Sequence, residues 1–265
     1  MKEKLFVVKI GGALIDDEVL LKEFLTQFSQ IKEKKILVHG GGKLATTLAN
    51  QLGIEQQMVD GRRITDKATL DIVTMVYAGG INKNIVAKLQ SVDCNAIGIS
   101  GADANVIQAK KRNHPQIDFG FVGDITVESI NRTLISNVLK LNLVPVFSAI
   151  THDKMGNLFN TNADTIASVI AQSLSDDFDV ELLYCFDKEG VLADVNNSSS
   201  VIKKVSSEDF LALKEAGKLH KGILPKLENA LAAAKNNVKK VYLIKETQLQ
   251  KHTENNHAGT EICLS

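Results

Sequence analysis

The amino-acid sequence predicts an α/β fold, a three-layer αβα sandwich around an open, mainly parallel β-sheet. Short apolar runs alternate with longer stretches whose apolar residues recur at helical spacing, and this order is typical of parallel sheets covered by helices. Two successive apolar runs also stop at glycine clusters before a helical pattern begins. Apolar residues make up 44% of the 265 residues, an ordinary share for a globular protein.

The first strand is expected at residues 5–10, where it stops at Gly11-Gly12, and a helix follows over residues 17–31. The second strand, residues 36–38, stops at the glycine cluster of residues 39–42 and leads into a helix over 44–52. The remaining strands are expected at 96–100, 144–147, 180–186 and 240–244. The remaining helices are expected at 67–77, 82–91, 127–140, 164–174, 207–216 and 226–236. Residues 105–123 and 151–159 alternate irregularly around Gly, Asn and His, so we expect β-hairpins there.

Composition excludes several classes of protein. Lys+Arg and Asp+Glu both number 31, and this balance argues against nucleic-acid binding, which normally needs a basic excess. The apolar runs are far shorter than the roughly 20 residues of a membrane helix, and we expect a cytoplasmic protein without a membrane partner. Three scattered cysteines make neither a disulfide framework nor a metal cluster. From a polar break at residues 172–179 we expect two lobes, residues 1–172 and 173–265.

The glycine turns could line a site for a polyanion, because ligands of parallel sheets bind beyond the carboxyl ends of the strands. Each cluster could also be only a tight turn. Neither a Walker A motif nor a dinucleotide fingerprint is present. The run His39 to Gly42 resembles the oxyanion loop of lipases, but the nearest nucleophile motif, Gly98-Ile99-Ser100-Gly101-Ala102, lacks its final glycine.

Three charged residues are candidates for a binding site. Lys9 ends an otherwise apolar strand, where it could face a crevice or merely extend its ammonium group to solvent. Asp164 begins a helix together with Asn162, and simple capping would explain both. Lys226 lies in a first helical turn, where a cation opposes the helix dipole and a bound anion would account for it.

Together these motifs resemble the amino acid kinase family, and within it the enzymes that phosphorylate N-acylglutamates. The matching segments occur in the family's order along almost the whole chain: Lys9 to Gly12, Val38 to Gly42, Asp60 to Thr65, Ala78 to Lys83, Asn160 to Asp164, Asp187 to Leu192 and Gly222 to Lys226. The resemblance implies that residues 1–172 bind the acyl-amino-acid and form the dimer contact. It implies that residues 173–265 bind ATP.

The resemblance also assigns roles to single residues. Lys9 and Lys226 hold the transferring phosphoryl group as catalytic residues, and Asp164 orients both. The substrate-binding residues are Gly41, Gly42, Arg63 and Asn160. The nucleotide-binding residues are Gly12, Asn162, Asp187, Lys188, Glu189, Gly190, Val191, Leu192, Lys218, Leu219 and His220. Lys188 and Glu189 are more charged than the family pattern leads us to expect.

The implied reaction uses ATP to phosphorylate the side-chain carboxylate of N-acetyl-L-glutamate, or of a close relative such as N-succinyl-glutamate. Its product is an N-acyl-L-glutamyl 5-phosphate. This reaction is the second step of arginine biosynthesis. The acceptor carboxylate, with a pKa of about 4.3, is already ionised at pH 7 and needs no general base. Mg²⁺ is expected through the nucleotide phosphates, with no metal site on the protein. The alternatives are a carbamate, aspartate or glutamate kinase and a catalytically silent nucleotide-binding regulator.

The assembly expected from the resemblance is a homodimer. Arginine-inhibited hexameric members of the family carry an additional N-terminal helix, whereas only eight residues precede Lys9 here. We expect the dimer to form through residues 67–91. That segment has more apolar residues than one packed helix face requires, including Ile72, Val73, Met75 and Val76.

Overall fold

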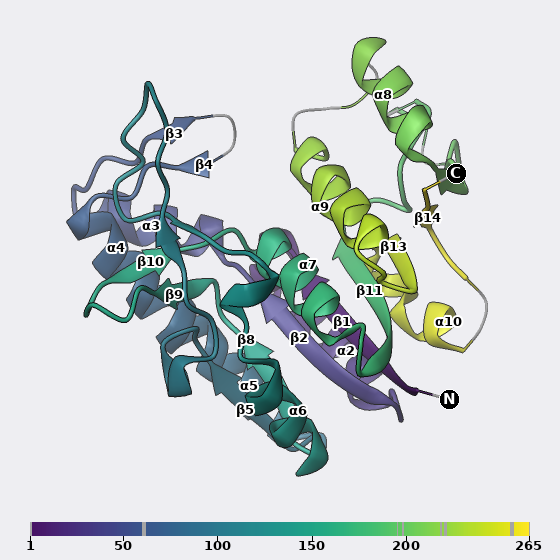
Figure 1. The fold of residues 1–265 in the computed structure, drawn as a ribbon, viewed down its shortest axis with the longest axis horizontal. Helices are drawn as coiled ribbons and strands as arrows, with labels where there is room; N and C mark the ends of the chain where they lie inside the picture. The colour runs from purple at the N-terminus through teal and green to yellow at the C-terminus, as the bar shows by residue number, and fades with distance from the viewer. Residues whose placement is uncertain are drawn as a thin grey trace.

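A computed structural model of the chain describes residues 2–59, 62–194, 196–197, 199–217, 219, 222–254 and 257–264. At its centre is an eight-stranded sheet of order β12-β14-β13-β11-β1-β2-β8-β5 (Figure 1). The strands are β1 (Glu3–Ile10), β2 (Lys34–His39), β5 (Ala96–Ile99), β8 (Val144–Phe147), β11 (Phe178–Phe186), β12 (Lys204–Val205), β13 (Lys240–Lys245) and β14 (Thr260–Ile262). All pairings from β13 to β5 are parallel, whereas β14 runs antiparallel to β13.

Helices cover both faces of this sheet. In β1 the consecutive side chains of Leu5, Phe6, Val7 and Val8 are all 0% exposed, as expected for a strand buried on both sides. One face packs against α6 (Arg132–Lys140), α7 (Ala163–Leu174) and α9 (Leu224–Lys235), which lie in front of the sheet in Figure 1. On the other side α2 (Glu18–Ser29) packs against α5 (Asn82–Gln90). The predicted three-layer sandwich is therefore confirmed.

Most predicted elements are present. All six predicted strands form the parallel part of the sheet, and the predicted hairpins are β6 (Lys110–Lys111) with β7 (Gly123–Asp124) and β9 (Ile150–His152) with β10 (Leu158–Asn160). The remaining predicted helices correspond to α3 (Gly42–Gln51), α4 (Lys67–Thr74) and α8 (Ser207–Glu215). The sequence did not reveal α1 (Gly12–Ile15), α10 (Leu249–Thr253), β12, β14 and the hairpin of β3 (Met58–Val59) with β4 (Arg62–Arg63).

Two predicted helices differ from the structure for local reasons. The expected helix at 127–140 begins as a 3₁₀ turn, Val127–Ser129, and restarts as α6 because the Asn131 side chain accepts a hydrogen bond from the backbone N–H of Leu134. After α4, the turn Met75–Ile81 is π-helical and leads directly into α5. The wider turn accommodates one extra residue, and such turns occur often at functional sites.

Smaller elements gather in two groups beside the sheet in Figure 1. The elements α3, α4, β3, β4, β9 and β10 gather on one side of the sheet's carboxyl ends, and α8, α9, β13 and β14 gather on the other. The prediction that residues 67–91 have apolar side chains to spare for a dimer contact is largely wrong. Ile72, Val73 and Val76 lie in the chain's own core. Of the four residues, only Met75 is exposed, at 57%.

Within the described residues, no helix has the length and apolarity needed to span a bilayer.

Candidate active site

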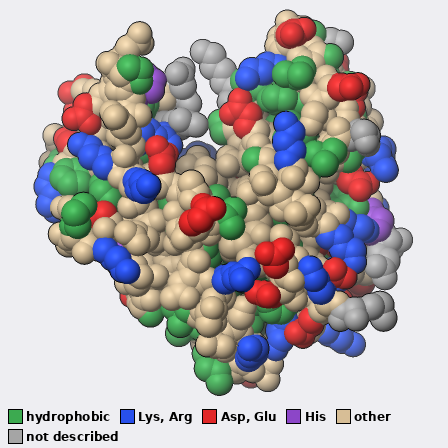
Figure 2. All heavy atoms as spheres, viewed as in Figure 1, with side chains coloured by type: hydrophobic (Ala, Val, Ile, Leu, Met, Phe, Trp, Pro, Cys, Tyr) green, Lys and Arg blue, Asp and Glu red, His purple; other side chains and the backbone are tan. Residues whose placement is uncertain are grey.

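Two cavities open beside the carboxyl ends of β1 and β2, in the hollow that Figure 2 shows between the two groups of elements. The first cavity, of about 250 Å³, is lined by Lys9, Gly12, Gly40, Gly41, Met58, Arg63, Tyr77, Arg112, Val122, Ala149 and residues 160–164. The second cavity, of about 290 Å³, is lined by Lys9, residues 11–14, Phe186, Asp187, Gly222, Ile223, Lys226 and Glu246. Lys9 and Gly12 line both cavities. They therefore mark the place where molecules bound in the two cavities would meet.

A cluster of one carboxylate and two ammonium groups lies at this junction. Nζ of Lys9 is 2.6 Å from Oδ1 of Asp164. Nζ of Lys226 is 2.9 Å from Oδ2 and 3.2 Å from Oδ1 of the same carboxylate. Lys9 comes from β1, Asp164 from the first turn of α7 and Lys226 from the first turn of α9. The structure thus brings together the three residues that the sequence identified far apart in the chain.

The electrostatics of the cluster keep it charged. Burial alone would raise the pKa of the Asp164 carboxyl, but the two adjacent lysines lower that pKa to about 2. Burial lowers the pKa of Lys9 to about 8, and Lys226 acts in the same direction while Asp164 opposes both. At pH 7 the carboxylate is ionised and the Lys9 ammonium is mostly protonated. With Lys226 the cluster carries excess positive charge, which suits it to bind an anion.

The backbone around Asp164 is held in two ways. The Asn162 side chain accepts a hydrogen bond from the Thr165 N–H at 3.0 Å and so caps α7. The Tyr184 hydroxyl, on β11 directly beside Lys9, donates to the Asp164 carbonyl oxygen at 2.9 Å. The capping interpretation is therefore correct for Asn162, whereas the Asp164 side chain is engaged by lysines.

The turn after β2 requires glycine. Gly41 has φ of +153°, and a Cβ placed on it would lie 2.1 Å from Cδ1 of Ile81 in the π-helical turn. Gly42 is the first residue of α3, and no side chain caps that helix. The first backbone N–H groups of α3 have no intrahelical partner, so the turn can donate hydrogen bonds to an anion.

His39 supports this turn and is not positioned for acid–base chemistry. Burial lowers its pKa to about 4, so the imidazole is neutral at pH 7. Its Nδ1 lies 2.9 Å from the Gly40 carbonyl oxygen, and its Nε2 lies 3.0 Å from the Asn82 amide nitrogen. Asn82 also donates to the Val146 carbonyl oxygen at 2.9 Å, which ties α5 to β8 and the glycine turn.

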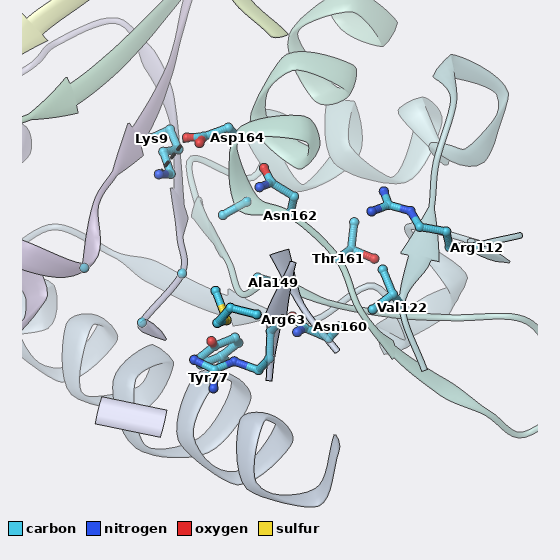
Figure 3. A pocket seen from close by; sticks show the side chains of 15 residues that line it. Lys9, Arg63, Tyr77, Arg112, Val122, Ala149, Asn160, Thr161, Asn162 and Asp164 are labelled. Carbon is cyan, nitrogen blue, oxygen red and sulfur yellow. Dashed lines mark ion pairs between the residues drawn. The ribbon is translucent and has the colours of Figure 1, made fainter. Parts of the chain in front are cut away.

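Arg63 and Asn160 line the first cavity, as Figure 3 shows. Arg63 is buried, and its guanidinium donates to the side chain of Gln56 and, at 2.9 Å, to Oγ1 of Thr46. The Asn160 amide donates to Oγ1 of Thr65 at 3.1 Å. These contacts fix both side chains beside the empty space of the cavity.

The nucleotide-binding residues expected from the sequence are only partly brought together. Gly12 and Asp187 line the second cavity. Glu189 instead pairs with Lys245 at 3.0 Å, and Val191 uses its N–H and C=O in hydrogen bonds to Thr260 and Ile202. Among the described residues, 188–192 do not line this cavity, and Leu219 packs against the core. Lys218 and His220 lie outside the described residues.

Several cavity residues were missed in the sequence. In the first cavity they include Tyr77 from the π-helical turn and Arg112, whose guanidinium pairs with Asp124. In the second cavity Glu246, the residue after β13, is buried, and burial raises the pKa of its carboxyl. Its Oε2 has no hydrogen-bond partner among the described residues. The position of Glu246 at a strand's carboxyl end was the one signal that could have identified it.

The whole chain can be compared with known proteins. The sequence matches the Amino acid kinase family over residues 4–245. The acetylglutamate kinase of Bacteroides fragilis is 48% identical over 262 residues, covering 99% of this chain and 98% of that protein. The acetylglutamate kinase of Cytophaga hutchinsonii is also 48% identical over 262 residues, covering 98% of each.

Among solved structures, the fold is similar to N-acetylglutamate synthase from Neisseria gonorrhoeae in complex with coenzyme A and N-acetyl-glutamate. The TM-score is 0.84 at 20% identity, over 100% of this chain and 60% of that one. Carbamate kinase from Giardia lamblia bound to AMP-PNP has a TM-score of 0.72 at 14% identity, over 99% of both chains. Sequence match, fold and the arrangement of the strand ends agree, and the chain belongs to the amino acid kinase family.

Proposed function

We propose that this protein transfers the γ-phosphoryl group of ATP to the side-chain carboxylate of N-acetyl-L-glutamate, the second step of arginine biosynthesis. The observation that carries the proposal is the cluster of Lys9, Asp164 and Lys226 at the junction of two cavities. Relatives named acetylglutamate kinase, 48% identical over almost the whole chain, support the choice of acceptor.

The chemistry needs positioning and charge neutralisation. A carboxylate oxygen of the substrate attacks the γ-phosphorus, the bond from that phosphorus to the β–γ bridging oxygen breaks, and ADP leaves with that electron pair. No proton is transferred, because the acceptor is already ionised at pH 7. Lys9 and Lys226 neutralise charge on the transferring group, and Asp164 holds both ammonium groups in place.

The two cavities divide the substrates between the lobes. In the first, Arg63 can bind a carboxylate in bidentate fashion, and Asn160 and the turn at Gly41 and Gly42 supply polar contacts. In the second, Phe186 and Ile223 offer apolar walls for a base. The carboxylates of Asp187 and Glu246 can accept hydrogen bonds from ribose or base. Within our proposal, residues 1–172 form the acyl-amino-acid lobe and residues 173–265 the ATP lobe, with the boundary in the last turn of α7.

The residues at the junction fit Mg²⁺ held through the nucleotide. At this junction the Asp164 carboxylate is already engaged by two lysines. Mg²⁺ commonly keeps waters and substrate phosphates as ligands, and there it would neutralise charge on the β- and γ-phosphates. The reaction draws on ATP, so the proposed location is the cytoplasm.

Initial rates of ADP formation test the proposal, with N-acetyl-, N-succinyl- and unsubstituted glutamate, aspartate and carbamate as acceptors. We expect turnover with the N-acylglutamates and trapping of the acyl phosphate by hydroxylamine as a hydroxamate. The ratio of the acetyl and succinyl rates decides which acyl group is preferred. Turnover with carbamate or aspartate alone would identify a different kinase, and no turnover with any acceptor would favour a silent regulator.

Substitutions in the charged cluster test the mechanism. Lys9→Ala, Lys226→Ala and Asp164→Asn should each lower kcat by about 10²–10³-fold, the usual cost of losing one transition-state contact, with smaller effects on KM. Asp179→Asn is the control, because Asp179 pairs with Lys239 at the surface and should keep normal turnover. Normal turnover in Asp164→Asn would mean that this carboxylate does not position the lysines.

A further inference from the structure

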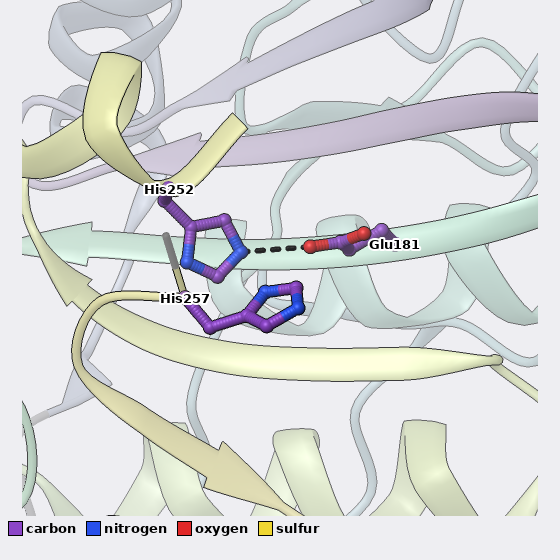
Figure 4. Close-up of side chains that lie close together, drawn as sticks. All are labelled: Glu181, His252 and His257. Atoms are coloured by element: carbon purple, nitrogen blue, oxygen red, sulfur yellow. Dashed lines mark hydrogen bonds and ion pairs between the residues drawn. The ribbon is translucent and has the colours of Figure 1, made fainter. Parts of the chain in front are cut away.

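A second group of ligand-type side chains lies in the C-terminal lobe, away from both cavities. Glu181 on β11, His252 on α10 and His257 before β14 turn their side chains toward one another (Figure 4). One ligand atom from each residue lies within 4.8 Å of the others. Glu181 and His252 are buried, whereas His257 is exposed. We propose that these three residues bind a zinc ion, and this goes beyond the kinase reaction.

The donor set suits zinc. Two imidazole nitrogens and one carboxylate oxygen form a ligand set that proteins use for Zn²⁺, usually with water in a fourth, open position. Zinc bonds of about 2.0–2.2 Å in a tetrahedron place neighbouring ligand atoms roughly 3.4 Å apart. The pair His252 Nε2 and Glu181 Oε1, now 2.7 Å apart, therefore has to widen slightly. His257 has to move closer, which its exposure allows, and the same exposure gives the ion a route of entry.

The surroundings orient the two imidazoles. Nδ1 of His252 lies 3.2 Å from the carbonyl oxygen of Ala258 and 3.2 Å from its N–H nitrogen. Metal binding requires the tautomer with the proton on Nδ1, in which His252 donates to that carbonyl in place of accepting from the Ala258 N–H and leaves its Nε2 lone pair for a metal, the arrangement common in metal sites. The Tyr242 ring packs on both histidines, edge-on at 4.5 Å to His252 and parallel at 5.6 Å to His257.

Lys4 places a positive charge beside the proposed zinc site. Its Nζ lies 3.1 Å from Oε2 of Glu181, so the two oxygens of this carboxylate face different partners. Oε1, which faces His252, is the atom available to a metal. The Lys4 ammonium repels a dication, and removing its charge should therefore tighten metal binding.

Zinc at this site would join three segments that are separate in the chain. It would fasten α10 and the residues leading into β14 to the central strand β11. Thr260 at the start of β14 accepts a hydrogen bond from the Val191 N–H, so the joined segment also supports the stretch after β11. Because a ligand that binds only the folded state stabilises it, the melting temperature should rise with zinc concentration.

The test uses the full-length protein stripped with a chelator and then titrated with ZnCl₂. We expect one tightly bound zinc per chain by elemental analysis, a higher melting temperature, and the visible absorption bands of tetrahedral Co²⁺ when cobalt replaces zinc. His257→Asn should weaken binding at least tenfold while the chain still folds, since His257 is exposed. His114→Asn, which removes an exposed histidine elsewhere, should bind zinc normally. Lys4→Gln should bind zinc more tightly.

These readouts are independent of kinase activity. Absence of zinc binding by the native chain would overturn the proposal. Equal zinc affinity in His257→Asn and the native chain would also overturn it, because the ion would then be bound elsewhere. A melting temperature that rises equally with zinc in both proteins would have the same meaning.

Discussion

Lys9 has to satisfy two opposing requirements. It is dehydrated at the end of β1, yet it has to stay protonated to neutralise a phosphoryl oxygen in the proposed reaction. Burial lowers its pKa to about 8 although Asp164 acts in the opposite direction. The ammonium form is therefore lost at the upper end of the usual assay range of pH.

We predict that kcat/KM for N-acetylglutamate falls as pH rises through about 8. Lys9 is charged below its pKa and neutral above it, so the active form disappears on the alkaline side. Lys9→Arg stays protonated throughout, because arginine does not lose its proton in proteins. Provided that this variant keeps measurable activity, its alkaline decline should move to higher pH. An unchanged decline in Lys9→Arg would assign the titration to another group.

Lys9 and Lys226 could be predicted from the sequence because each one breaks a local rule, whereas Asp164 is ordinary in a first helical turn and only the resemblance identified it. Lys9 interrupts an apolar strand, and Lys226 opposes a helix dipole. Arg112 and Glu246 break no such rule. Arg112 comes to the cavity through a hairpin whose path depends on tertiary packing, and Glu246 is one charged residue among many until its burial is known.

At the scale of elements, the hairpin of β3 and β4 supplies Arg63 to the first cavity. We predict that Arg63→Lys raises KM for the acylglutamate about tenfold or more and leaves KM for ATP nearly unchanged, since an ammonium group cannot replace bidentate carboxylate binding. Arg132→Lys, at a surface arginine paired with Asp176, is the control and should change neither constant. An effect of Arg63→Lys on ATP alone would mean that the substrates occupy the opposite lobes.

The π-helical turn Met75–Ile81 presses Ile81 against Gly41. We predict that Gly41→Ala destabilises the fold by about 1–3 kcal/mol, as overpacking usually does, and lowers kcat/KM, because the new methyl group would displace Ile81 or the turn. Gly79→Ala lies in the same π-helical turn and meets open space, so its stability should stay close to that of the native chain. The melting temperatures and kcat/KM of the two variants check this; equal values would show that the turn tolerates a side chain at Gly41.

Long periodic elements could be predicted from sequence, and short ones could not. The six parallel strands are continuous apolar runs, and all of them except the edge strand β5, where Ile97 is 38% exposed, are covered on both faces. By contrast β12 and β14 have two and three residues and depend on their neighbours in the sheet. Residues 67–77 have the apolar spacing of an ordinary α-helix, although the π-helical turn Met75–Ile81 begins within them. Only the structure therefore shows the wider turn.

For the whole molecule, assembly remains the main prediction. We expect a homodimer, which light scattering should show as twice the chain mass of 28.8 kDa. Met75 is exposed and lines a shallow surface cavity together with Leu70, Phe121, Leu158 and several polar residues, so we place it in the proposed contact. Met75→Glu should shift the mass toward the monomer, whereas Leu211→Glu in α8, equally exposed, should leave it unchanged. A hexamer mass would contradict this assembly.

The position of β1 in the sheet affects how the protein folds while the ribosome makes it. β1 lies between β2 and β11, and its residue Glu3 pairs with Phe178, so β1 leaves the ribosome long before its partner β11. One edge of β1 therefore stays unpaired until β11 has been made. Contacts so distant in sequence slow folding. An unpaired apolar strand invites aggregation in the meantime. The nascent chain should accordingly depend on chaperones until β11 emerges, and its N-terminal lobe should remain sensitive to proteases up to that length.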